Sequence, residues 1–195
     1  MTGTARVGMS TLVSTIRGFC NLGTDDYTLG TSTYWSDENV EIVLDRHRTT
    51  VVRERLAEVV DHTGGGTIEY KEFRSGFGNF EETTGGTAIF ILENAEGGDL
   101  ATTLYSVDYA NGIITFGTTQ AGSSRYLTGR SYDVFGAAAD AYRVKAGAYS
   151  EAVNFKTDNM SVNRGELIKN CMRMASNYAA LGYAQTVNMI RDDSV

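Results

Sequence analysis

Two kinds of hydrophobic periodicity divide this sequence, and this division most restricts the folds open to it. Near both ends, apolar residues recur at intervals of three or four, the spacing of one face of an α-helix. From Val51 to Thr128 the period is mostly two, the spacing of β-strands. The sequence therefore predicts an α+β fold: a helical bundle of about four helices, with an antiparallel β module inserted between the second and third helices.

The N-terminal part predicts two helices. Over residues 9–21, Leu12 and Ile16 lie on one helical face. The second helix is expected to begin at Ser36, since a serine cap followed by two acids suits the positive end of the helix dipole. It should give way to extended chain near Arg48, because the next residues are β-branched. The polar stretch between the helices, from Gly23 to Trp35, predicts a loop.

The central part predicts about four to six antiparallel strands. Residues 67–73 alternate between apolar and polar side chains, and Ala88–Leu92 form a short apolar strand. Asn111-Gly112 separates two further strands and predicts a type I′ hairpin turn, which requires positive φ at both residues. Glycine provides most of the other turn signals, because the chain has 22 glycines and no proline.

Two helices are expected to close the fold. The first, within residues 133–149, carries Ala137, Ala138 and Ala139, whose small side chains let another helix approach closely. The last has a wide apolar stripe that should be buried on two sides, by the core and by a neighbour. The stripe comprises Leu167, Ile168, Cys171, Met174, Ala175, Tyr178 and Leu181.

These patterns predict a division of the chain into a helical body, an insertion and an arm. The body takes residues 1–50 and 129–182, the insertion residues 51–128, and the arm residues 183–195. In the arm, apolar residues alternate as in an edge strand: Val187 and Met189, with Ile190 next to them. The arm is either a disordered tail or a segment that orders on a partner by adding a strand to its sheet.

Composition argues against tight binding of nucleic acid or membrane. The net charge is −7, whereas gripping DNA phosphates requires clustered lysine and arginine. An acidic protein can still surround DNA and leave it free to slide. The longest apolar run, Ala88–Leu92, is far shorter than a membrane span. Cys20 and Cys171 fall in helical patterns and are interpreted as buried thiols, with a disulfide as the alternative.

No motif of catalysis, cofactor binding or metal binding is recognisable, so we expect neither an enzyme nor a cofactor. His47 and His62 lack a second metal ligand at helical spacing and are interpreted as surface or packing residues. The segment 76–80 lacks the third glycine of a dinucleotide fingerprint and the lysine of a P-loop, which favours a β-region loop. The acidic pairs Asp25-Asp26 and Glu81-Glu82 are interpreted as solvated.

The order of these parts resembles that of a known family. The helix start Tyr34-Trp35-Ser36-Asp37-Glu38 is followed by the insertion, which ends in the hairpin at 108–116. Tyr132-Asp133-Val134 then leads into Ala137-Ala138-Ala139-Asp140 and a long final helix. Over roughly residues 10–182, this order resembles the head–tail adaptor (connector) proteins of tailed bacteriophages.

The resemblance implies a structural protein of the virion neck, made in the cytoplasm of the host bacterium. Family members form a homo-oligomeric ring, commonly a dodecamer, beneath the portal protein. The ring extends the channel through which DNA is ejected, without specific DNA binding. It contacts a stopper, tail-tube or terminator protein below. By the same resemblance, residues 183–195 would contact the portal through Val187, Met189 and Ile190.

Three other functions compete with this interpretation. One is a different neck protein, such as a tail-completion protein that binds the tail tube. Another is a small hydrolase that uses loop carboxylates. The third is a carbohydrate-binding β module in which Tyr27, Tyr34 and Trp35 stack on sugars, although these aromatics are better explained as anchors of their loop.

Overall fold

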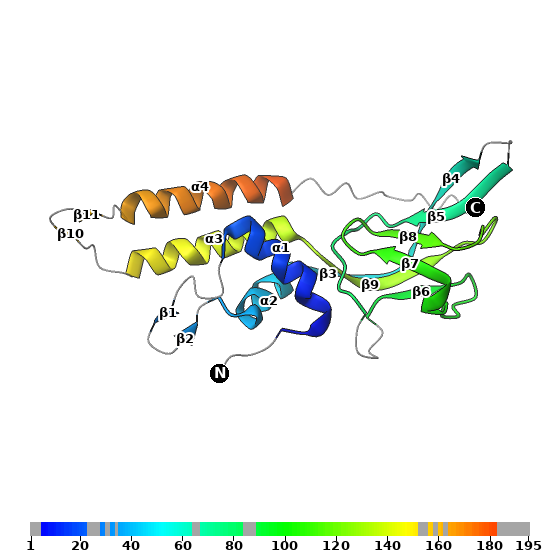
Figure 1. The fold of residues 1–195 in the computed structure, drawn as a ribbon, viewed down its shortest axis with the longest axis horizontal. Helices are drawn as coiled ribbons and strands as arrows, with labels where there is room; N and C mark the ends of the chain where they lie inside the picture. The colour runs from blue at the N-terminus through cyan, green and yellow to red at the C-terminus, as the bar shows by residue number, and fades with distance from the viewer. Residues whose placement is uncertain are drawn as a thin grey trace, which may run out of the picture. The chain divides into compact units, whose positions relative to one another are not determined.

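The computed structural model describes residues 5–22, 28–29, 32–33, 35–63, 67–83, 89–151, 156–157, 160–161 and 164–182. Within these residues the fold is mixed α+β, with four helices and antiparallel sheets, as the periodicity predicts (Figure 1). Helices lie at both ends of the chain and most strands lie in the middle. The element order is less simple than expected, because short strand pairs also separate the first two helices and the last two.

The described chain divides into two compact units. The helical unit comprises the described residues up to His47 and from Asp133 to Gly182, and the β unit comprises Arg48–Tyr132. The helices of the first unit are α1 (Ser10–Cys20), α2 (Asp37–Asp45), α3 (Val134–Glu151) and α4 (Arg164–Gly182). Its strand pairs are β1 (Thr28–Leu29) with β2 (Ser32–Thr33), and β10 (Lys156–Thr157) with β11 (Met160–Ser161).

Local signals fix the ends of the first two helices. Ser36 Oγ accepts a hydrogen bond from the Asn39 N–H at 3.3 Å, which caps α2 as the sequence predicts. Asn21 takes a left-handed conformation, with φ of 48°, and ends α1 at the boundary of the predicted range 9–21. The stretch that was expected to be a plain loop contains the β1–β2 ladder.

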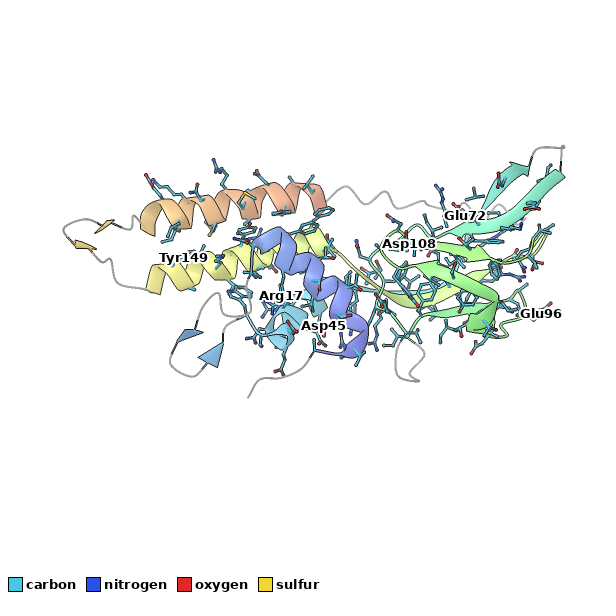
Figure 2. The ribbon with its side chains drawn as sticks, viewed as in Figure 1. Arg17, Asp45, Glu72, Glu96, Asp108 and Tyr149 are labelled. Carbon is cyan, nitrogen blue, oxygen red and sulfur yellow. The ribbon has the colours of Figure 1, made fainter. Side chains whose placement is uncertain are left out.

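In the helical unit, α4 lies alongside α3, and α1 and α2 also pack against α3 (Figure 1). The apolar faces of α1 and α2 are buried, including Leu12, Ile16 and Leu44. Ion pairs hold the polar sides of these two helices: Arg17 Nη2 lies 2.6 Å from Asp37 Oδ1. Arg6, before α1, pairs with Asp45 at the end of α2; Figure 2 labels Arg17 and Asp45.

The described residues of the β unit form seven strands, more than the four to six expected. They are β3 (Arg48–Arg55), β4 (Ala57–Thr63), β5 (Thr67–Arg74), β6 (Ile91–Glu93), β7 (Tyr105–Asp108), β8 (Ile113–Phe116) and β9 (Tyr126–Tyr132). All pairs are antiparallel. They form a three-stranded sheet in the order β3-β9-β6 and a four-stranded sheet in the order β4-β5-β8-β7.

The core of the β unit is rich in aromatic side chains. Phe80 and Phe90 meet edge to face with ring centroids 5.3 Å apart, and Phe73 meets Phe116 in the same way at 5.5 Å. The buried cluster is completed by aliphatic residues from several strands. These are Val51, Leu56, Leu92, Ile114 and Leu127.

The predicted type I′ turn is wrong. Strand pairing stops at Asp108 and Ile113, so four residues form the turn, and of Asn111 and Gly112 only Gly112 has positive φ. The Asp108 carboxylate explains the difference, because it accepts hydrogen bonds from the Ala110 and Asn111 N–H groups and holds the chain in an Asx-type turn.

One further segment departs from expectation, and another agrees with it. Residues 129–132, which we assigned to the helical body, continue strand β9 and pair with β3 as far as Arg48. The glycine-rich segment 76–80 is a loop, as predicted, and it packs on the β7–β8 turn. The Asn79 N–H donates to Ala110 O at 2.9 Å, and Glu54 accepts from the Gly76 N–H at 2.7 Å.

Candidate functional site

The alanine-rich face of α3 lies at the centre of the helical unit. Ala137, Ala138 and Ala139 are each 0% exposed. The Cys20 thiol approaches the backbone of this face and donates to Ala138 O at 3.6 Å. Side chains this small allow neighbouring elements to come close to the helix backbone.

The two cysteines are buried, and neither forms a disulfide. Burial raises the pKa of the Cys20 thiol to about 12, which makes it unreactive at neutral pH. The interpretation as buried thiols is therefore confirmed.

A stack of four aromatic rings joins α1, α3 and α4. Phe19 stacks on Phe135 and on Tyr178, in each case with ring centroids 5.6 Å apart, and Tyr142 stacks on Tyr178 at 5.8 Å. The hydroxyls of Tyr142 and Tyr178 both donate to Phe19 O. These contacts satisfy a carbonyl near the C-terminal end of α1, so the stack acts as structural support.

A cavity of about 280 Å³ opens beside this helical packing, and we refer to it as the His47 cavity. Four of its lining residues have little or no side chain, which leaves the space open. The lining consists of His47, Asp133, Gly136, Ala139, Arg143, Ala179 and Gly182. Polar atoms of His47 and Asp133 converge at this concave site, which makes it the candidate functional site.

Asp133 is held at the cavity by its role as the cap of α3. Its Oδ1 accepts hydrogen bonds from the Phe135 and Gly136 N–H groups at 3.1 and 3.0 Å. Its other oxygen, Oδ2, faces two glycines: a Cβ atom added to Gly136 would lie 2.6 Å from it, and one added to Gly182 would lie 2.8 Å from it. The capping bonds thus fix the carboxylate while leaving Oδ2 toward the cavity.

His47 also lines the cavity, and Asp140 fixes the orientation of its ring. The two residues lie 2.8 Å apart, between His47 Nε2 and Asp140 Oδ2. A carboxylate only accepts hydrogen bonds, so Nε2 carries a proton; when the ring is neutral, Nδ1 is then an acceptor. That Nδ1 would lie 2.7 Å from a Cβ atom on Gly136, so it faces the same spot as Asp133 Oδ2.

The Asp140 carboxylate has a hydrogen-bond partner on each of its two oxygens. Partial burial by itself raises its pKa, but hydrogen bonds from His47 and Arg143, together with their charges, outweigh burial and lower it below its ordinary value. Arg143 Nη1 donates to the other carboxylate oxygen, Oδ1. Asp140 therefore stays ionised and neutralises the nearby arginine.

The β unit contains a second polar cluster, and it corrects one prediction. Glu81 was expected to be solvated, but it is 0% exposed. Its Oε2 accepts from the Tyr132 hydroxyl at 2.8 Å and lies 3.4 Å from Arg130 Nη1. The Glu81 N–H also donates to Arg130 O, so this cluster fastens the segment to β9. A charge this deeply buried needs such partners.

The residues singled out in the sequence differ in what the structure shows of them. Val187, Met189 and Ile190, and also Tyr27 and Tyr34, are outside the described residues. Trp35 is only 3% exposed, so it anchors its segment and cannot offer a ring face to a sugar. Ala139 lines the cavity, whereas Ala137 and Ala138 do not.

Sequence reasoning did not identify the cavity. His47 was interpreted as a surface or packing residue, and its partner Asp140 lies far along the chain. One available signal was Asp133, a good helix cap directly before an apolar helical run. Gly136 and Gly182 both lie next to the Asp133 carboxylate, and no sequence pattern indicates that they do.

No family of known proteins, no curated protein and no solved structure matches this chain. Among the described residues, no group of three or more His, Cys, Asp or Glu side chains is placed to hold a metal ion. In the same part of the chain, no helix has both the length and the apolar character needed to cross a membrane.

Proposed function

We propose that this chain is a structural protein of the phage neck, which forms a ring beneath the portal, extends the DNA channel and joins head to tail. The observation that carries the proposal is the order of parts along the chain. A capped helix starting at Ser36-Asp37-Glu38 is followed by strands that include the 105–116 hairpin and end with β9, and then by an alanine-rich helix and a long final helix. This is the arrangement of a helical body with an inserted β module, by which the sequence resembles the adaptor family.

Exposed apolar side chains on α3 and α4 support the oligomeric part of the proposal. Val144, Leu167, Met172 and Leu181 are each more than a third exposed. A ring requires that one surface of a subunit fit a different surface of the next, and apolar residues left uncovered in a monomer are suited to such contacts. We assign α3 and α4 to the subunit contacts, with Ala137–Ala139 as the close-packing point within each subunit.

The charge of the chain supports a passive relation to DNA. With a net charge of −7, the ring would repel the duplex rather than grip its phosphates. We propose no enzymatic role, since the sequence carries no recognisable catalytic motif. The arm at residues 183–195 remains the proposed contact with the portal, through Val187, Met189 and Ile190.

Electron microscopy of the purified full chain mixed with the portal protein tests the proposal. We expect a ring stacked on the portal, commonly twelvefold. Met189→Asp should abolish stacking, because a carboxylate would have to enter an apolar contact, while Val52→Asp, at an exposed position of β3, serves as the matched control. Monomers that never bind portal would overturn the proposal, and binding to a tail tube instead would identify a tail-completion protein.

A further inference from the structure

We propose that the His47 cavity binds an organic cation, namely a guanidinium or alkylammonium group such as the end of an arginine or lysine side chain. The inference does not depend on the proposed neck function. It follows from the acceptors that face the cavity, from their charge and from the size of the space.

Two hydrogen-bond acceptor atoms face the cavity. Both capping hydrogen bonds go to Asp133 Oδ1, and no donor among the described residues bonds to Oδ2. In the neutral form of the ring, with Nε2 donating to Asp140, His47 Nδ1 is also an acceptor. Both atoms face the same point above Gly136. Two acceptors directed at one point require a guest with several donors, and guanidinium or ammonium groups have donors only.

The charge of the site selects a cation over an anion. Arg143 is neutralised by Asp140, which leaves the Asp133 carboxylate as the uncompensated charge of the lining. Ala179 and Gly182 belong to the last turn of α4, where unsatisfied carbonyls give a helix its negative end. The positive end of α3 is already capped by Asp133 itself.

The size of the cavity limits the guest. At about 280 Å³ it lies at the lower end of the range for ligand pockets, which suits a single side chain or a small amine. The glycines are part of the site, because a methyl group on Gly136 or Gly182 would intrude on Asp133 Oδ2.

Titration of the full chain with agmatine at pH 8, followed by the NMR signals of the His47 ring and by calorimetry, tests the site. At this pH ordinary imidazoles are neutral. We expect saturable shifts at His47 with agmatine, and none with inorganic phosphate. The arginine derivative with both ends blocked distinguishes the sources: equal or tighter binding points to a protein side chain, and weaker binding to a free amine. Tighter binding of phosphate or of Mg²⁺ than of agmatine would overturn the proposal.

Three variants localise the binding. Asp133→Asn keeps the helix cap, because asparagine caps as well as aspartate, but removes the charge, and should weaken agmatine about tenfold or more. Gly182→Ala should weaken it by filling the site. Gly147→Ala, on α3 with no atom within 4 Å of the added methyl, should leave it unchanged. Trp35 fluorescence verifies that each variant is folded, and wild-type affinity in a folded Asp133→Asn variant would refute the site.

Discussion

The helical unit and the β unit achieve close packing by opposite means. On the central face of α3, side chains are reduced to methyl groups, and Ala137, Ala138 and Ala139 are fully buried. The β unit fills its interior with large rings, among which Phe73 and Phe80 are at most 1% exposed. The first arrangement should therefore be sensitive to added volume, and the second to removed volume.

Removing a ring from the β unit should give the largest effect. Phe80→Ala is expected to destabilise the unit by about 3–5 kcal/mol, because Phe80 is buried and packs edge to face on Phe90. Hydrogen exchange of the β5 and β9 amides measures the loss. Phe77→Ala, which removes a partly buried ring at the edge of the same core, is the control and should cost clearly less. If Phe80→Ala and Phe77→Ala lost equal stability, the buried ring would matter no more than the edge ring, and the contrast between the units would be contradicted.

Adding volume to the helical unit should cost less, roughly 1–3 kcal/mol. In Ala138→Leu the new side chain has no free space, because Ala138 is fully buried and its carbonyl contacts Cys20. Trp35 is the only tryptophan, is buried and lies in the helical unit, so its fluorescence in urea reports this change. Ala180→Leu makes the same substitution at an exposed position of α4 and should remain within about 0.5 kcal/mol of the wild type.

The contrast between the units also explains how far the sequence could be interpreted. The start of α2 was predictable, because the Ser36 cap acts on an N–H group three residues away. The mixed α+β class followed from periodicity, which reports which face of an element is buried. Both signals are local.

The failures involve contacts between segments distant in sequence. Glu81 was expected to be solvated, yet its partner Tyr132 lies 51 residues away. His47 and Asp140 are separated by 93 residues, so their pairing could not be expected from either neighbourhood. The turn at Asn111-Gly112 was a local failure with a different cause: the dipeptide preference yielded to the Asp108 carboxylate.

A tight turn in the β unit allows added volume to be tested outside a core. A Cβ atom on Gly112 would lie 2.1 Å from Phe77 O, whereas one on Gly122 meets nothing within 4 Å. Both glycines have positive φ, 65° and 71°, so alanine causes similar backbone strain at each. Gly112→Ala should therefore be less stable than Gly122→Ala by about 1–2 kcal/mol, the effect of the clash alone. Equal stabilities, measured by urea denaturation, would mean that the loop at Phe77 yields freely.

The smallest expected effect concerns two carboxylates, one in each unit. Hydrogen bonds and charges from His47 and Arg143 lower the pKa of Asp140 despite partial burial. At Asp108, in the β unit and labelled in Figure 2, hydrogen bonds from the Asn111 side chain and backbone lower the pKa. A lowered pKa means that each ionised carboxylate stabilises its unit above the ordinary value of 3.8. This contribution is lost as the pH falls through the folded-state pKa below that value.

Asp140→Asn should therefore reduce stability by about 0.2–1 kcal/mol at pH 6, and the difference from wild type should vanish in the acid range below 3.8. Asp108→Asn should follow the same direction with pH. The salt dependence of stability distinguishes the two variants, because Asp140 has charged partners and Asp108 has neutral ones. Raising the ionic strength should reduce the loss of stability in Asp140→Asn and leave the loss in Asp108→Asn largely unchanged. Urea denaturation at two salt concentrations, with Trp35 fluorescence for the first variant and amide exchange of β7 and β8 for the second, measures both. A salt-independent Asp140 effect would mean that its hydrogen bonds, rather than its charge, stabilise the wall of the His47 cavity.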